Sequence, residues 1–175
     1  MNITFDLETL GNTANAPIVQ IGAVKFDDDG TITDKFKKNI DLDSLEGLGF
    51  RIDYNTLEWW FSQSHEAITS VFNTDNLNRV SLSKALYEFH QWIGKTADYR
   101  YWSHATFDPP ILINNYKALK KDCPIPFRLY MDIRTLTSLC PERIKVERIG
   151  THHDALDDCI YQAAYISNGL KQLKK

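Results

Sequence analysis

The first strand-like segment most restricts how this chain can fold. Residues 3–8 read ITFDLE, so apolar and polar side chains alternate strictly. A period of two is typical of a β-strand with two unlike faces, and the apolar residues, starting at Ile3, share one of them. Asp6 and Glu8 then leave the other face side by side, about 7 Å apart at a rise of roughly 3.3 Å per residue.

Two carboxylates held this close repel each other unless a proton or a cation relieves the charge. Divalent cations with oxygen ligands are the natural partners, and they predict further carboxylates elsewhere in the chain. Solvated acids on an edge strand are the alternative interpretation. However, the first strand of an α/β domain usually lies centrally, where unpaired acids are costly, and this favours a functional role for Asp6 and Glu8.

Composition sets the outer limits. With 175 residues, of which 43% are hydrophobic, the chain can bury one substantial core, so we expect a single domain over residues 1–175. The sequence contains no run of 18 apolar residues, so we expect no membrane span, and the first residues do not resemble a signal peptide. The three cysteines are odd in number and widely spaced, which indicates reduced thiols in a cytoplasmic protein.

The net charge of −3 argues against a protein that binds nucleic acid mainly through a broad basic face. It leaves nucleic acid open as a substrate, because metal ions held by the acids would themselves attract phosphate. The sequence lacks the motifs of two other enzyme classes. It contains neither the G-x-S-x-G elbow of a serine hydrolase nor the G-x-x-x-x-G-K-[ST] phosphate loop.

The order of the expected elements indicates one α/β domain. Three antiparallel strands come first, with a tight turn at Asp29-Gly30 between the second and third. Short helices follow, capped by Asn55 or Thr56, by Ser64, and by Ser81 or Ser83. We therefore expect a central mixed five-stranded sheet flanked by helices, with strands near residues 3–9, 18–26, 31–40, 99–104 and 128–131.

Three further residues extend the acidic pair. Asp108 precedes Pro109-Pro110 and so could be an ordinary helix N-cap, or could lie where open α/β sheets bind ligands. His153 and Asp158 are five residues apart, about 140° out of register on a helix, so they do not share a helical face.

We expect His153 just before the last helix, as a proton acceptor that moves in with substrate, and Asp158 as a fixed ligand in its first turns. The alternative is a solvated helix start, where several acids complement the helix dipole. Spacing alone does not choose among Asp154, Asp157 and Asp158, or between His152 and His153.

Three blocks of sequence resemble the motifs of the DEDD 3′–5′ exonucleases in their histidine-bearing (DEDDh, DnaQ-like) branch. These blocks are FDLETLG at residues 5–11, WSHATFD at residues 102–108 and HDALDD at residues 153–158. The third motif selects His153 over His152, and Asp158 over its acidic neighbours. Within the branch, residues 56–64 and 107–112 are most similar to phage- and prophage-type exonucleases and to bacterial exoribonucleases of the RNase AS type.

The resemblance implies an RNase H-like fold and a 3′–5′ exonuclease. Such an enzyme hydrolyses single-stranded DNA or RNA from the 3′ end and releases nucleoside 5′-monophosphates. Two divalent ions, Mg²⁺ or Mn²⁺, would be held by Asp6, Glu8, Asp108 and Asp158. His153 would be the general base, and Glu8 would contribute to catalysis as well as to metal binding.

Substrate contacts are expected beside the first motif and on the first helix. Single-stranded ends are usually held by base stacking, so Trp59 or Trp60 is a candidate, although core packing is an equal alternative for one of them. The full set of expected substrate contacts is Thr9, Leu10, Trp59, Trp60 and Gln63. The sequence leaves open a homodimer, and a catalytically inactive RNase H-like module that binds a polymerase or another protein is the alternative function.

Overall fold

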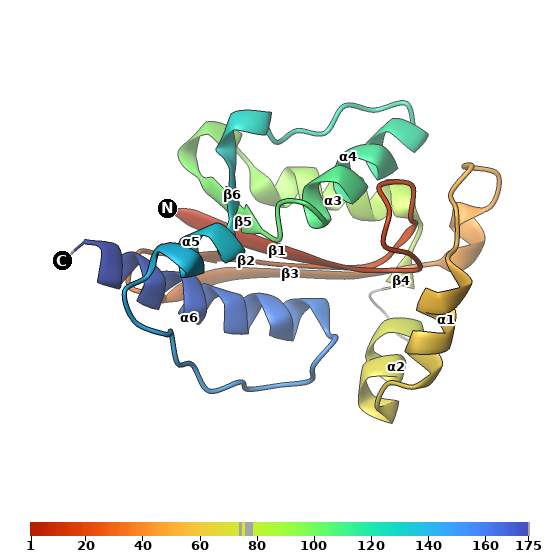
Figure 1. Cartoon of the computed structure of the whole chain (residues 1–175). Coiled ribbons are helices and arrows are strands. Elements are labelled where there is room, and N and C mark those ends of the chain that lie inside the picture. The colour runs from red at the N-terminus through yellow and green to blue at the C-terminus, as the bar shows by residue number, and fades with distance from the viewer. Residues whose placement is uncertain (74, 76–78, 175) are drawn as a thin grey trace.

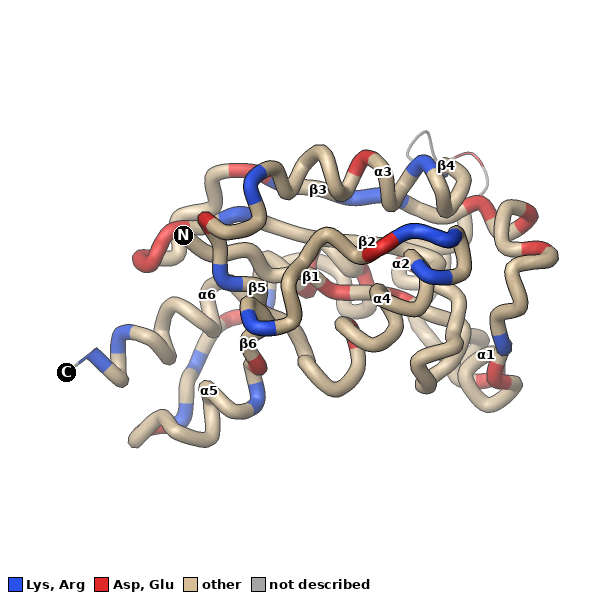
Figure 2. The backbone as a smooth tube through the Cα atoms, turned by 90° about the horizontal axis from the view of Figure 1, so that it is seen from above, with Lys and Arg blue, Asp and Glu red and all other residues tan. Residues whose placement is uncertain are grey.

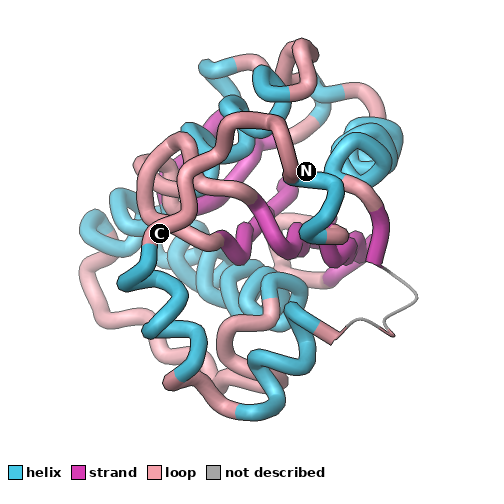
Figure 3. The backbone as a smooth tube through the Cα atoms, turned by 90° about the vertical axis from the view of Figure 1, so that its right-hand side faces the viewer, coloured by secondary structure: helices cyan, strands magenta, loops and turns pink. Residues whose placement is uncertain are grey.

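The chain is built as a sheet covered by helices on both faces. In the computed structural model, which describes residues 1–73, 75 and 79–174, α3 and α4 cover one face and α5 and α6 the other (Figure 1). A view from the side shows the strands as a middle layer between these helices (Figure 3). Helices α1 and α2 lie together beyond one end of the sheet (Figure 1).

The sheet has the strand order β4-β3-β2-β1-β5-β6, so β1 is central, as the sequence indicated. Strands β1, β2 and β3 pair antiparallel, whereas β5 and β6 continue the sheet parallel to β1. The bounds are β1 (Asn2–Thr9), β2 (Ile18–Phe26), β3 (Ile32–Ile40), β4 (Arg79–Val80), β5 (Arg100–Ser103) and β6 (Tyr130–Asp132).

The predicted mixed sheet with three antiparallel first strands is confirmed, but the strand count of five is wrong. The additional strand, β4, has two residues and pairs parallel with Asn39 and Ile40 at the edge of the sheet. A two-residue strand is too short to show a period of two, so its sequence carried no signal.

Side chains just before three of the helices accept hydrogen bonds from free backbone N–H groups, and two of them, Ser64 and Ser81, were expected caps. Ser64, Ser81 and Asp132 act in this way for α2, α3 and α5. The helices are α1 (Tyr54–Phe61), α2 (His65–Phe72), α3 (Leu82–Ile93), α4 (Asp108–Ala118), α5 (Ile133–Leu139) and α6 (Ala155–Leu173), with 3₁₀ turns at η1 (Leu42–Leu45), η2 (Thr96–Asp98) and η3 (Phe127–Leu129).

One predicted cap was wrong, and one of the two roles left open for Asp108 is not observed. Helix α1 is capped by Asp53, not by Asn55 or Thr56, because the Asp53 carboxylate accepts the N–H of Asn55. Asp108 is the first residue of α4 rather than its cap, and Phe107 holds the cap position without a side-chain hydrogen bond.

Strand β1 has the two unlike faces that its alternation predicted. Ile3 and Phe5 are fully buried in the core under α3 and α4. On the opposite face, the Thr4 hydroxyl donates to Gln162 of α6. Asp6 shares this second face, so the fold brings it against the helix that carries Asp158.

The start of α6 sits unusually close to β2 because residue 22 is a glycine. A Cβ atom on Gly22 would overlap the backbone of Ala155 and Leu156. Next to this contact, Gln20 Oε1 accepts the N–H of Ala155 at 2.7 Å. Asp154 caps the helix and also bonds to Lys37 and Ser70. These contacts fix where His153 and Asp158 lie.

Cys123, Cys140 and Cys159 all carry free thiols. In the described part of the chain, none of the helices is both long and apolar enough to cross a bilayer.

We predict that Gly22→Ala destabilises the protein by about 1–3 kcal/mol, the usual cost of inserting a methyl group where there is no room. Urea unfolding of the variant and the wild type measures this cost. An unchanged free energy of unfolding would show that α6 does not depend on the close approach at Gly22.

Candidate metal centre

A cavity of about 600 Å³ opens beside the second half of β1, on the side of α6 and α1. This volume lies within the usual range for small-molecule and cofactor sites. Its walls bring together segments that are far apart in sequence, namely β1, the start of α4, α1 and the start of α6. The acidic and histidine side chains in these walls are Asp6, Glu8, Asp53, His104, Asp108, His152, His153 and Asp158.

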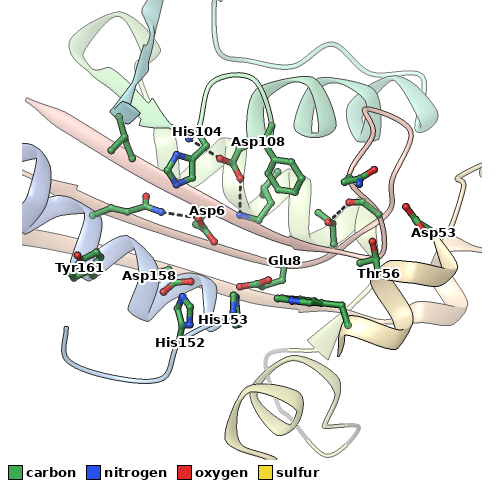
Figure 4. A pocket seen from close by; sticks show the side chains of 18 of the residues that line it. Asp6, Glu8, Asp53, Thr56, His104, Asp108, His152, His153, Asp158 and Tyr161 are labelled. Carbon is green, nitrogen blue, oxygen red and sulfur yellow. Dashed lines mark hydrogen bonds between the residues drawn. The ribbon is translucent and has the colours of Figure 1, made fainter. Parts of the chain in front are cut away.

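Three carboxylates meet in the cavity. One oxygen from each of Asp6, Glu8 and Asp158 lies within 4.8 Å of the others. Figure 4 shows their side chains facing the same space between β1 and α6. Glu8 and Asp158 are only 7% and 8% exposed, so water screens their repulsion poorly.

The pKa values of this group show the cost of the arrangement. Burial, and then the charge of Asp158, raises the pKa of Asp6 from 3.8 to about 7. Burial and the Asp6 charge also raise the pKa of Glu8 well above its ordinary value. Protons or a bound cation are the two means of relieving such a cluster.

Asp108 lies in the wall of the same cavity but is held differently. It is 1% exposed, and its two oxygens accept the N–H groups of Leu7 at 3.3 Å and His104 at 2.9 Å. Burial and the charge of Asp6 raise the pKa of Asp108 well above its ordinary value. Asp108 is thus close enough to interact with Asp6, although it does not belong to the close group of three.

Side chains on α6 and before it hold the carboxylates in place. Gln162 Nε2 donates to Asp6 Oδ1 at 2.8 Å, while Gln162 Oε1 accepts from Thr4 at 2.7 Å. Arg148 forms an ion pair with Asp158 and lies over the Tyr161 ring, with 4.3 Å between the guanidinium carbon and the ring centre. Sequence reasoning missed Gln162, although its position four residues after Asp158 places both on one helical face.

His153 lies directly before Asp154, the cap of α6, and its ring forms part of the cavity wall. Its φ is 64°, a left-handed conformation that residues with a Cβ adopt infrequently. The ring meets Trp59 edge-on, with 4.6 Å between ring centres. Burial, and next the neighbouring His152, lowers the pKa of His153 below 6.5.

The donor set fits hard divalent cations. Mg²⁺ and Mn²⁺ prefer oxygen ligands, and the ligand atoms of this carboxylate cluster are all oxygens. A bound cation would also replace the protons that otherwise neutralise the cluster. The Lys and Arg positions, in contrast, are dispersed over many elements of the fold rather than collected on one face (Figure 2).

The expected substrate contacts divide into two groups. Thr9 and Trp59 line the cavity. Trp60 is 2% exposed and donates its Nε1 to the Thr9 carbonyl, and Leu10 packs against it. The Gln63 amide bonds to the Trp59 carbonyl of its own helix. The cavity wall therefore does not include Leu10, Trp60 or Gln63. Trp60 and Gln63 instead form hydrogen bonds to Thr9 and Trp59, which do line the cavity.

Comparison with solved structures shows that the fold is similar to part of exonuclease I. An apo exonuclease I structure matches 98% of this chain with a TM-score of 0.68 and 13% identity. The complex of Escherichia coli exonuclease I with a dT13 oligonucleotide matches 95% of the chain, with a TM-score of 0.67 and 13% identity. The chain spans about two fifths of these proteins, 42% and 40% of their lengths.

A family model identifies the chain more narrowly. The model described as "3'-5' exoribonuclease Rv2179c-like domain" matches residues 1–170. The chain belongs to this family. No curated protein gives a significant match.

The raised pKa values predict how metal-free stability depends on pH. Asp6 keeps a proton in the folded state up to about pH 7 but loses it near 3.8 when unfolded. Between these values the folded state binds more protons, so the contribution of Asp6 to stability is complete below 3.8 and disappears as the pH rises through about 7. Metal-free Asp6→Asn should therefore gain stability relative to the wild type as the pH rises from about 5 to about 8.

Urea unfolding in a chelator at both pH values measures this gain, and comparison with the wild type cancels the titrating groups that do not interact with Asp6. Saturating Mg²⁺ should remove most of the difference by stabilising the wild type. A stability difference between the two proteins that is the same at both pH values would contradict the proposed burial of charge.

Proposed function

We propose that this protein is a metal-dependent 3′–5′ exonuclease that hydrolyses single-stranded nucleic acid and releases nucleoside 5′-monophosphates. The observation that carries the proposal is the convergence of Asp6, Glu8 and Asp158 within 4.8 Å of one another, with Asp108 beside them and His153 at the rim. Membership of the exoribonuclease family supports the same reaction.

Two divalent ions, Mg²⁺ or Mn²⁺, are proposed to supply an activated water and to stabilise the leaving 3′ oxygen. Asp6, Glu8 and Asp158 would hold these ions, and Asp108 would complete the ligands by giving up a backbone hydrogen bond. Gln162 keeps the Asp6 carboxylate turned toward the cavity through its bond at 2.8 Å.

His153 is proposed to accept the proton of the attacking water. Its lowered pKa keeps the imidazole neutral near pH 7 and so able to take a proton. The edge-on contact with Trp59 limits the rotation of the ring. Trp59 is 40% exposed, which leaves its outer surface available to stack on a base of the substrate.

RNA is the proposed preferred substrate. The family description supports this choice. The complex of exonuclease I with dT13 makes single-stranded DNA the natural alternative to test.

We predict that the wild type shortens a 5′-labelled single-stranded RNA oligonucleotide from its 3′ end in Mg²⁺, and shortens the matched DNA more slowly. A 3′-terminal phosphate should slow the reaction, and a chelator should abolish it. Gel analysis together with chromatography of the released nucleotides measures direction and product. Products shortened from the 5′ end would contradict the proposal.

Asp6→Asn and Asp158→Asn should each abolish detectable turnover in this assay while the protein stays folded. The matched control is Asp34→Asn, an exposed aspartate on β3 outside the cavity, and it should retain full activity. Activity near the wild-type level in either cavity variant would exclude the proposed metal ligands. No activity in the wild type itself would instead favour a binding module without catalysis.

His153→Asn should reduce kcat by about 10²–10⁴, the usual contribution of a general base. Mn²⁺ affinity, followed by the electron paramagnetic resonance signal of the free ion, should change little. A fall in Mn²⁺ affinity that alone accounts for the lost activity would make His153 a ligand instead of a base.

A further inference from the structure

Asp158 belongs to two sets of metal-binding atoms. Among the described residues, the oxygens of Asp6, Glu8 and Asp158 form one set within 4.8 Å, and ligand atoms of His152, His153 and Asp158 form a second set within the same limit. The first set contains oxygen alone, whereas the second contains two imidazoles.

We propose that His152, His153 and Asp158 form a zinc site whose occupation inhibits the exonuclease. The inhibitory part of this inference rests on the proposed function. The site itself rests on the side-chain geometry, because nitrogen ligands favour Zn²⁺ whereas Mg²⁺ and Mn²⁺ prefer the oxygen-only set.

The backbone at the start of α6 is what makes this site. Neighbouring side chains in an extended segment point to opposite sides. Here His153 has a φ of 64°, and the two rings lie together with 3.8 Å between their centres and 32° between their planes. Figure 4 shows both imidazoles directed toward Asp158 and the cavity.

The spacing suits zinc after small rotations of the side chains. Ligand atoms of a tetrahedral zinc site lie about 3.4 Å apart, since each is about 2.0–2.1 Å from the ion. The ligand atoms of His152, His153 and Asp158 lie within 4.8 Å of one another, so small rotations bring them to that separation. His152 is exposed, so an ion reaches the site directly from solvent, and water can supply the fourth ligand.

Arg148 is the internal competitor for this site. Its guanidinium bonds to Asp158 Oδ1, so an ion must bind through the other oxygen or displace Arg148. The bulk of the guanidinium and its positive charge both oppose binding, and Zn²⁺ gains two imidazole bonds in return.

Occupation would block the proposed reaction in two ways. The imidazole nitrogen of His153 that coordinates Zn²⁺ no longer accepts a proton, and Asp158 is drawn away from Asp6 and Glu8. Both effects are reversed when the ion leaves. The site would make the enzyme sensitive to zinc while millimolar Mg²⁺ is present.

His152→Asn tests the site without changing a residue assigned to the proposed machinery. We expect it to keep its activity in Mg²⁺ but to need at least about tenfold more Zn²⁺ for half inhibition, because a ligand is lost. His90→Asn is the matched control, since His90 is an exposed histidine on α3 outside the cavity, and its zinc sensitivity should equal that of the wild type.

Zinc binding is measured separately by competition with a chromophoric chelator, without substrate and with saturating Mg²⁺ to occupy the carboxylate set. We expect one ion bound to the wild type and to His90→Asn, with at least about tenfold weaker binding to His152→Asn. Zinc K-edge absorption of the wild-type complex should show two histidine nitrogens at about 2.0–2.1 Å.

Equal zinc affinity and equal inhibition in His152→Asn and the wild type would overturn the proposed site. A spectrum with oxygen ligands alone would also overturn it and would assign zinc to the Asp6 set. If His152-dependent binding is found in a protein that degrades neither RNA nor DNA, the zinc site stands and the proposed nuclease function fails.

Discussion

The structure is organised around the electrostatic repulsion among three carboxylates that lie close together. Asp6, Glu8 and Asp158 are brought within 4.8 Å of one another under cover from α6 and α1, where water screens charge poorly. A stability-driven fold would replace such residues, since buried like charges oppose folding. The folded protein is less stable because of this cluster, and in return it has a pocket with a negative charge that attracts cations. Functional sites commonly lower stability in this way.

The rest of the fold can be understood as support for this cluster. Alternation along β1 places its apolar residues in the core and leaves Asp6 and Glu8 on the face toward α6. Gly22 lets the start of α6 approach β2, and Gln20 and Asp154 secure the helix by hydrogen bonds. The left-handed residue His153 then turns its ring into the cavity wall immediately before the helix that carries Asp158.

Patterns with a clear physical period were readable from the sequence. The strand at residues 18–26 was predicted at its observed bounds, and Ser64 and Ser81 were among the expected caps. The convergence of the acids was predicted from like-charge repulsion at Asp6 and Glu8 together with family motifs that selected Asp108, His153 and Asp158. Spacing alone left the choice between His152 and His153 open, because the two neighbours lie at nearly the same distance in sequence from Asp158.

Other features depended on contacts that no local pattern encodes. The two-residue strand β4 forms because Ile40 and Asn39 offer an edge, not because Arg79-Val80 has a strand signature. Trp59 and Trp60 look alike in sequence, and only packing shows that Trp60 bonds to Thr9 in the core while Trp59 faces the cavity. The pairing of Arg148 with Asp158 joins an irregular segment to a helix, which sequence spacing does not predict.

We propose that Asp6, Glu8, Asp108 and Asp158 form a metal centre, and diffraction from crystals soaked in Mn²⁺, recorded where manganese scatters anomalously, tests this proposal. We expect two anomalous peaks enclosed by these four side chains. Crystals in saturating Mn²⁺ without a peak between the four side chains would contradict the metal centre.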